Sequence, residues 1–112
     1  MAVEDFAISA EERDDEVVVD VRGEIDLSTA PLLDQRLSQL AGTQKLVVNL
    51  TGVTFLDSSG LGVLVRTSNK VETHGGVIRL VVSHPQVQKV LEITGLASTL
   101  PVFRTLDAAR SA

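Results

Sequence analysis

The chain has 112 residues, of which 44% are apolar, and a formal net charge of −5. This length and composition predict one globular domain with one core, spanning residues 1–112, while the acidic balance argues against a nucleic-acid phosphate backbone as a partner. The lack of cysteine excludes disulfides and thiolate sites, and the lack of a leader-like or membrane-length apolar run predicts a cytoplasmic protein.

Two strands are predicted at the start of the chain. Residues 3–9 suit an edge strand, and residues 16–22 are rich in the β-branched residues typical of strands: Val17, Val18, Val19 and Val21. The wholly charged segment 11–16 indicates a turn between them rather than a metal cluster, because nothing directs its carboxylates inward. Gly23 is expected to end the second strand.

An amphipathic helix is predicted next. Asp26, Ser28 or Thr29 is able to cap it, and Pro31 suits its first turn. Its apolar stripe is spaced at i, i+4 and i+7: Leu33, Leu37 and Leu40.

A third strand over residues 45–50 is nearly continuous in apolar residues, as expected for a strand buried on both faces. Thr51-Gly52 is expected to begin a turn. A second helix is predicted from about Ser58 to His74, before Gly75-Gly76. Its expected inner face consists of Leu61, Leu64, Val65 and Ser68.

The remaining elements are predicted to be short. They are a strand over 77–82, a helix from Pro85 that ends before Gly95, a strand within 100–103 and a helical turn over 105–109. The alternation of strand and helix from residue 16 onward predicts an α/β domain. We expect a mixed, mostly parallel sheet of about four or five strands, packed with about four helices and carrying one antiparallel edge.

The segment Asp57-Ser58-Ser59-Gly60-Leu61-Gly62 carries the chemical interest. One serine suffices to cap the second helix, which leaves the other hydroxyl for modification near a helix N-terminus that tolerates a phosphate. Each glycine costs about 1 kcal/mol relative to alanine inside a helix, which indicates that a strand or a partner protein approaches the backbone there. From the residues alone, tight helix–sheet packing with an N-cap and a presented hydroxyl both remain open.

The same segment, after an apolar strand, resembles the signature of anti-sigma factor antagonists, which are built on a STAS domain. Gly23-Glu24-Ile25-Asp26 resembles the family's Gly-Glu-hydrophobic-Asp segment. Gly75-Gly76 and Thr94-Gly95-Leu96 also fall where the family has similar residues. The order of elements fits along nearly the whole chain.

The resemblance implies a switch protein rather than an enzyme. In the family, the unmodified protein binds an anti-sigma factor that is also a serine kinase, and this binding frees a sigma factor for transcription. The kinase uses ATP to phosphorylate the serine directly after the motif's aspartate, which is Ser58 here, and a serine phosphatase reverses the reaction. The resemblance implies no cofactor for this chain itself.

The expected partner surface comprises Asp26, Asp57, Ser58, Ser59, Gly60 and Leu61. Asp26 is either a helix cap or a contact to a basic group of the kinase. Asp57 orients the Ser58 hydroxyl or caps the turn. A scaffold or sensor role in a stress-signalling complex is the alternative within the same fold.

Catalysis by this chain is disfavoured. A serine nucleophile with His74 or His84 as base lacks the Gly-x-Ser-x-Gly elbow, and His74 would lie about 24 Å along the helix from Ser58. The histidines lack metal-ligand spacing, and Val65 stands where a dinucleotide-binding fingerprint needs its third glycine.

Overall fold

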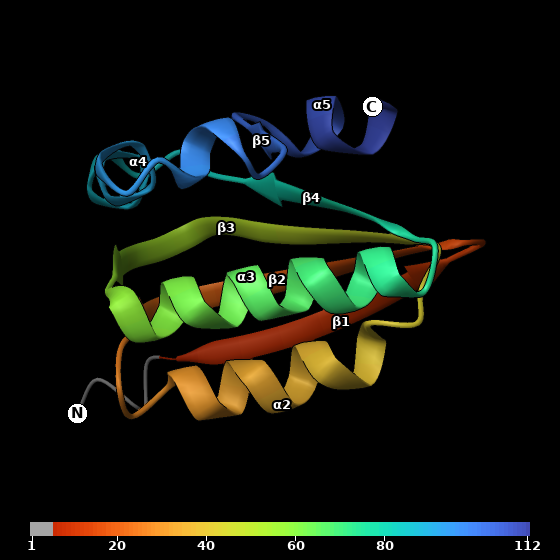
Figure 1. The fold of residues 1–112 in the computed structure, drawn as a ribbon, viewed down its shortest axis with the longest axis horizontal. Coiled ribbons are helices and arrows are strands. Elements are labelled where there is room, and N and C mark those ends of the chain that lie inside the picture. Colours follow the sequence, from red (N-terminus) through yellow and green to blue (C-terminus); the bar gives the residue numbers. More distant parts are fainter. Residues whose placement is uncertain (1–5) are drawn as a thin grey trace.

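The computed structural model describes residues 6–112, and its five strands form one sheet in the order β1-β2-β3-β4-β5 (Figure 1). The strands are β1 (Ala7–Arg13), β2 (Glu16–Ile25), β3 (Lys45–Leu56), β4 (Val77–Val81) and β5 (Val102–Phe103). β1 pairs with β2 in antiparallel fashion, and all later neighbours are parallel. The predicted α/β class with one antiparallel edge is therefore confirmed.

Four α-helices and one 3₁₀ helix are present within residues 6–112. They are α2 (Ala30–Leu40), α3 (Ser58–Thr73), α4 (Pro85–Ile93), η1 (Leu96–Ser98) and α5 (Leu106–Ser111). The helices α2 and α3 lie side by side on one face of the sheet (Figure 1), and α5 packs on the other face against Val18, Val47 and Val81. None of these described helices combines the length and apolar character needed to span a bilayer.

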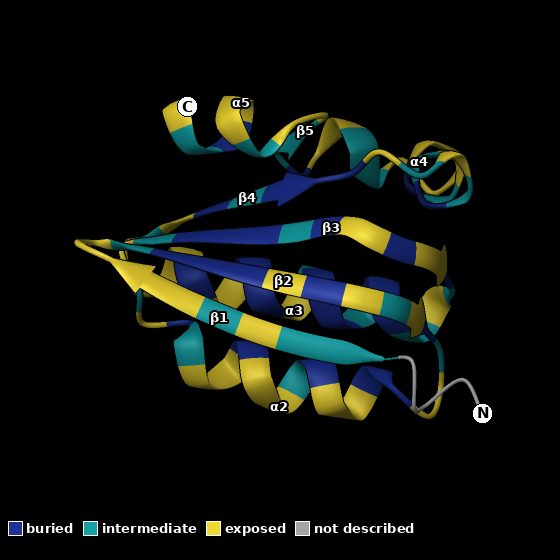
Figure 2. Cartoon of the chain, turned by 180° about the vertical axis from the view of Figure 1, so that it is seen from behind, coloured by how far each residue is buried: buried dark blue, intermediate teal, exposed yellow. Residues whose placement is uncertain are grey.

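The core divides between the two faces because side chains alternate along each strand. In β2, Val17, Val19 and Val21 point into the larger cluster under α2 and α3, whereas Val18 joins the smaller cluster under α5. In α2, Leu33 and Leu37 are buried as predicted, and Leu40 is only partly buried. Figure 2 shows the alternation of buried and exposed residues along β2.

The first strand differs from the prediction. Residues 3–5 of the expected strand 3–9 lie outside the described residues, but β1 continues through Arg13, so the turn shrinks to Asp14-Asp15. Charged residues 11–13 belong to the strand because β1 is an edge strand whose side chains reach solvent there.

Two further boundaries were also wrong. Gly23 does not end β2, and Thr51-Gly52 does not begin a turn, because both lie inside long strands that pair as far as Ile25 and Leu56. The register shifts between Asp20 and Arg22 and again after Gly23, whose φ is 102°. In a sequence, a glycine at a β-bulge looks the same as a glycine at the end of a strand. Here the glycines lie at irregularities within continuous strands.

The far half of β3 runs beyond the end of β4, which pairs only with residues 45–49. Helix α4 covers part of the exposed edge. The Gln86 side-chain amide accepts a hydrogen bond from the Leu56 amide at 3.1 Å, and its Nε2 donates to the Leu56 carbonyl at 3.4 Å. This amide replaces the missing strand at the last residue before the segment Asp57–Gly62.

Candidate functional site

The carboxyl ends of β2 and β3 meet at one edge of the sheet. Ile25 pairs with Leu56, and the amide of Asp57 donates a hydrogen bond to the Ile25 carbonyl at 3.2 Å. Asp26 and Asp57 therefore leave the sheet side by side, and Ser58 begins α3 directly afterwards. The expectation that Asp26 and Ser58 share one end of the sheet is confirmed.

Asp57, rather than a serine, caps α3. Its Oδ1 accepts hydrogen bonds from the amides of Ser59 at 2.9 Å and Gly60 at 3.3 Å, and also from the Ser59 hydroxyl. The amide of Leu61 donates to the Asp57 carbonyl at 3.0 Å. Of the two roles considered for Asp57, the structure has the cap, and its carboxylate holds Ser59 rather than Ser58.

The two serines thus occupy different environments. Ser59 is partly buried and its hydroxyl is committed to Asp57. Ser58 is exposed, and its hydroxyl makes no hydrogen bond to any residue in the described part of the chain. Only the Ser58 hydroxyl is free to meet another molecule without first breaking an internal contact.

Gly60 and Gly62 serve different purposes. A Cβ on Gly60 would lie 2.4 Å from Leu56 Cδ1 and 2.6 Å from Ile25 Cγ2, so a hydrogen is the only side chain that fits there. The sequence predicted that a strand or a partner approaches the backbone at these glycines. At Gly60 the approaching groups are side chains at the ends of β2 and β3. At Gly62 the nearest atom is Nη1 of Arg66, at 3.2 Å from the Cβ position, and the backbone is otherwise open.

Leu61 packs in the core with a relative exposure of 9%, next to the buried Gly60. A partner on this face would meet Asp57, Ser58, Ser59 and Asp26 before either of these residues. The inner face of α3 also differs from its prediction, because Val63 and Thr67 are buried while Val65 is only partly buried. Packing of α3 against α2 beside it, as well as on the sheet, widens the buried stripe.

Asp26 organises the turn between β2 and α2. Its Oδ1 accepts hydrogen bonds from the Ser28 amide at 3.0 Å, the Ser28 hydroxyl at 2.9 Å and the Thr29 amide at 3.2 Å. These bonds, led by that of the Ser28 hydroxyl, hold the pKa of the Asp26 carboxyl below its ordinary value of 3.8. The formal N-cap of α2 is Thr29, whose hydroxyl donates to the Glu24 carbonyl at 2.7 Å.

A shallow groove connects this edge to the surface between α2 and α3. Ser58, Ser59 and Gly62 form one side, and the other side is formed by residues of α2 and the turn before it: Leu27, Ala30, Pro31 and Asp34. Leu27 is 81% exposed. The groove thus combines an exposed apolar side chain with one carboxylate, Asp34, and one guanidinium, Arg66, which suits a protein partner that presents apolar and charged groups.

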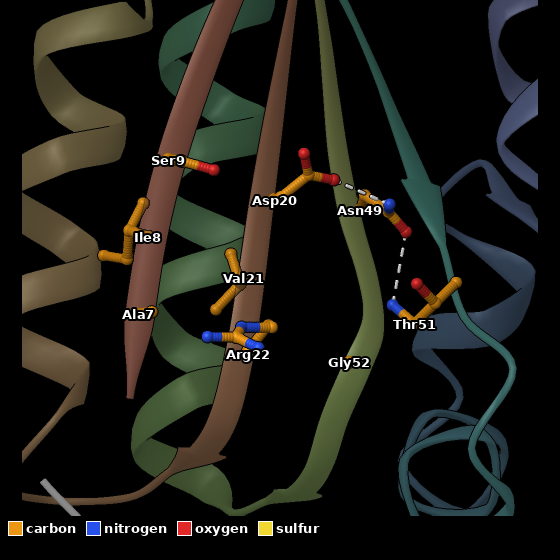
Figure 3. Close-up of a pocket in the computed structure, with 9 residues that line it drawn as sticks. All are labelled: Ala7, Ile8, Ser9, Asp20, Val21, Arg22, Asn49, Thr51 and Gly52. Carbon is orange, nitrogen blue, oxygen red and sulfur yellow. Dashed lines mark hydrogen bonds between the residues drawn. The ribbon is translucent and has the colours of Figure 1, made fainter. Parts of the chain in front are cut away.

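A second hollow lies on the opposite face of the sheet, where α5 leaves β1, β2 and β3 uncovered (Figure 3). Asp20 Oδ1 accepts a hydrogen bond from Asn49 Nδ2 at 2.7 Å, and Asn49 Oδ1 accepts one from the Thr51 amide at 3.2 Å. These polar groups are therefore already paired across and along the strands.

The histidines serve at helix ends. His84 is the N-cap of α4, and its Nδ1 accepts a hydrogen bond from the Gln86 amide at 3.2 Å. His74 lies at the far end of α3 from Ser58, with Nδ1 at 2.7 Å from the Lys70 carbonyl. Within residues 6–112, no group of three or more His, Asp or Glu side chains converges on a possible metal site.

Comparison with known proteins relates this arrangement to one family. The model of the STAS domain matches residues 7–109. The chain is 31% identical over 96 residues to the anti-sigma-B factor antagonist of Bacillus subtilis, and the match covers 85% of this chain and 88% of that relative.

Solved structures show the same fold. The crystal structure of an anti-sigma factor antagonist from Mycobacterium paratuberculosis superposes with a TM-score of 0.88 and 35% identity, covering 95% of this chain and 92% of that one. The Bacillus cell fate determinant SpoIIAA in its phosphorylated form shares the fold with a TM-score of 0.71 at 23% identity, covering 94% of this chain and 97% of its own.

Proposed function

The chain belongs to the STAS domain family, and from this premise we propose that it is an anti-sigma factor antagonist switched by phosphorylation of Ser58. In its unmodified form it binds an anti-sigma factor that is also a serine kinase, and the sigma factor is released for transcription. The phosphorylated form does not bind. Its relatives of Bacillus subtilis and Mycobacterium paratuberculosis carry the name of antagonist, which supports the first part of the proposal.

One observation carries the choice of Ser58. Its hydroxyl is exposed and forms no hydrogen bond within residues 6–112, whereas the neighbouring Ser59 hydroxyl is held by Asp57. A kinase that approaches the groove between α2 and α3 finds the Ser58 oxygen exposed and without an internal hydrogen bond in the described chain. SpoIIAA, which shares the fold, exists in a phosphorylated form, so the fold accommodates a phosphate.

The chemistry requires little of this chain. The Ser58 Oγ forms a bond to the γ-phosphorus of ATP as the bond from that phosphorus to the ADP oxygen breaks, and the hydroxyl proton passes to a base. Asp57 is a poor candidate for that base because its carboxylate oxygen already accepts from two amides and a hydroxyl. The kinase therefore supplies the base, the nucleotide and the metal, while the antagonist supplies a positioned acceptor.

The magnitude of the switch points to an interface effect. A shift from nearly all bound to nearly all free takes about 5.5 kcal/mol. Interaction of a phosphate with the α3 dipole is worth about 0.3–1 kcal/mol and acts within the antagonist alone. A phosphoserine adds about −1.5 to −2 charges at neutral pH, in a groove that already contains Asp34 and lies beside Asp26 and Asp57. Burial of that charge in the interface with the partner costs several kcal/mol, which is large enough to account for the loss of binding.

The test is affinity capture of the tagged protein from its native cells, with mass spectrometry of both the bait's phosphosites and its partners. We expect a kinase-fold regulator to be captured by Ser58→Ala and lost with Ser58→Glu. Ser59→Ala is the matched control and should still be phosphorylated at Ser58. Equal capture by Ser58→Glu and Ser58→Ala, or an unmodified Ser58 under every growth condition, would count against the proposal.

A further inference from the structure

Arg66 lies on the same stripe of α3 as the proposed phosphorylation site. Ser58, Gly62 and Arg66 are spaced at i, i+4 and i+8, which places them one above another on a helix. All three line the groove between α2 and α3, where Arg66 is the one cation among the lining residues that the structure describes. The groove that receives a phosphate on Ser58 therefore already contains a guanidinium.

The Arg66 side chain is folded back toward the start of the helix. Its Nη1 lies 3.2 Å from the position that a Cβ on Gly62 would occupy. The guanidinium therefore stands one helical turn, about 6 Å of rise, from the level of Ser58. Because Gly62 has no side chain, this residue places no side-chain atom between the guanidinium and Ser58.

The present partner of Arg66 is weakly held. Nη2 lies 3.6 Å from Asp34 Oδ2, and the side chains are 55% and 35% exposed. The other oxygen, Asp34 Oδ1, is buried and has no hydrogen-bond partner within residues 6–112. A single, long and half-exposed ion pair is easily exchanged for a stronger one.

The N-terminus of α3 is a poor alternative for the phosphate. The amides of Ser59 and Gly60 already donate to the Asp57 carboxylate, and the amide of Leu61 donates to the Asp57 carbonyl. The Asp57 carboxylate also repels a second anion placed beside it. A phosphate on Ser58 is thus directed away from the helix end and along the groove.

We propose that a phosphate on Ser58 takes the Arg66 guanidinium from Asp34 and holds it across Gly62. A doubly charged phosphate offers a guanidinium two parallel hydrogen bonds, which the present pair with Asp34 lacks. The exchange closes the Ser58 end of the groove and leaves the Asp34 carboxylate on α2 without its counter-ion. Phosphorylation then changes the shape of the groove as well as its charge. That Ser58 is phosphorylated in the cell rests on the function proposed above, but the contact between a phosphate on Ser58 and Arg66 does not.

The experiment installs phosphoserine at position 58 during synthesis, so no kinase is needed. The second pKa of the phosphate, ordinarily about 6, is measured by ³¹P NMR in three backgrounds: native, Arg66→Gln and Arg104→Gln. Arg104 is exposed between β5 and α5, so its loss controls for the change in net charge. We expect the native and Arg104→Gln phosphates to titrate about half a pH unit below the Arg66→Gln phosphate. The Arg66 Nε–H resonance should follow the same titration.

Coincident titration curves for Arg66→Gln and Arg104→Gln would overturn the proposal, as would an Arg66 resonance that ignores the phosphate. These results are separable from failure of the proposed function. Absence of phosphorylation in cells removes the occasion for the switch, but it leaves the pKa difference in the installed phosphoprotein intact.

Discussion

The amide of Asp57 donates a hydrogen bond to the carbonyl of Ile25 at 3.2 Å, and this bond extends the pairing of β2 and β3 by one step beyond Leu56. The last residue of β2 thereby fixes the N-cap of α3, the helix that follows β3. The start of α3 is consequently as well defined as the sheet itself, and Ser58 is presented on a rigid element. A rigid presentation suits a site that a kinase must recognise in one geometry.

Loss of the Asp57 cap should destabilise the protein. Asp57→Ala removes an acceptor for the amides of Ser59 and Gly60 and for the Ser59 hydroxyl. We expect the free energy of unfolding, measured by urea denaturation, to fall by about 1–2 kcal/mol. Ser58→Ala, which removes a hydroxyl without a hydrogen bond in the described chain, should change it by less than about 0.5 kcal/mol. A larger loss in Ser58→Ala than in Asp57→Ala would contradict the assignment of the cap.

The two glycines of α3 should respond in opposite ways to alanine. Gly60→Ala forces a Cβ to within 2.4 Å of Leu56 Cδ1 in the core, and we expect a loss of about 1–3 kcal/mol. Gly62→Ala meets only the flexible end of Arg66 and should gain up to about 1 kcal/mol from helix propensity. Thermal unfolding of the two variants side by side tests the contrast. Equal effects of the same sign would refute it.

The order and type of the elements followed from the sequence because each signal had a single physical source. The run of valines made β2, the leucine stripe made α2, and α4 ends before Gly95 as expected, with Gly95 in the left-handed region at φ 80°. The boundary errors in β2 and β3 lay at Gly23 and Gly52, which stand next to register shifts inside the ladder. Whether a strand continues past such a glycine depends on its neighbour in the sheet, which local sequence does not contain.

In the candidate site, too, some features could be predicted from the sequence and others could not. The nearness of Asp26 to Ser58 followed from parallel topology, because consecutive strands end at one edge. Which serine Asp57 would hold, and which glycine the core would require, depended on the rotation of α3 about its axis. The role of Gln86 had no local signal, since its partner Leu56 is 30 residues earlier and lacks a neighbouring strand on that side only because β4 is short.

Asp26 should make stability depend on acid pH. The pKa of its carboxyl is lowered in the folded protein, chiefly by the hydrogen bond from the Ser28 hydroxyl, so folding favours the ionised form. That contribution is fully present above the ordinary pKa of 3.8 and is lost as the pH falls through the lower folded value. We expect Asp26→Asn to be less stable than the native protein at pH 7, with the difference shrinking below about pH 4.

The measurement is urea unfolding of both proteins across this pH range, with Glu12→Gln as a control for loss of one exposed negative charge. The same variants test the second role considered for Asp26. If Asp26→Asn folds with little loss at pH 7 but no longer captures the proposed kinase-fold partner, the carboxylate acts mainly as a contact. If stability and capture fall together, the turn before α2 is what the partner requires.

Gln86 should support the Ser58 segment from a distance. Its amide satisfies both the N–H and the C=O of Leu56, two residues before the proposed phosphorylation site, where no strand is available to do so. Gln86→Ala leaves two backbone groups of the last β3 residue without protein partners, and we expect a loss of about 1–3 kcal/mol. Gln88→Ala removes only an exposed hydrogen bond to Glu92 on the same helix and should cost less than about 0.5 kcal/mol. Hydrogen exchange distinguishes support from general packing, because Gln86→Ala should speed exchange of the Leu56 amide far more than that of the Val48 amide in the first half of β3. Uniform acceleration along β3 would mean that Gln86 stabilises the domain as a whole and does not position the start of α3.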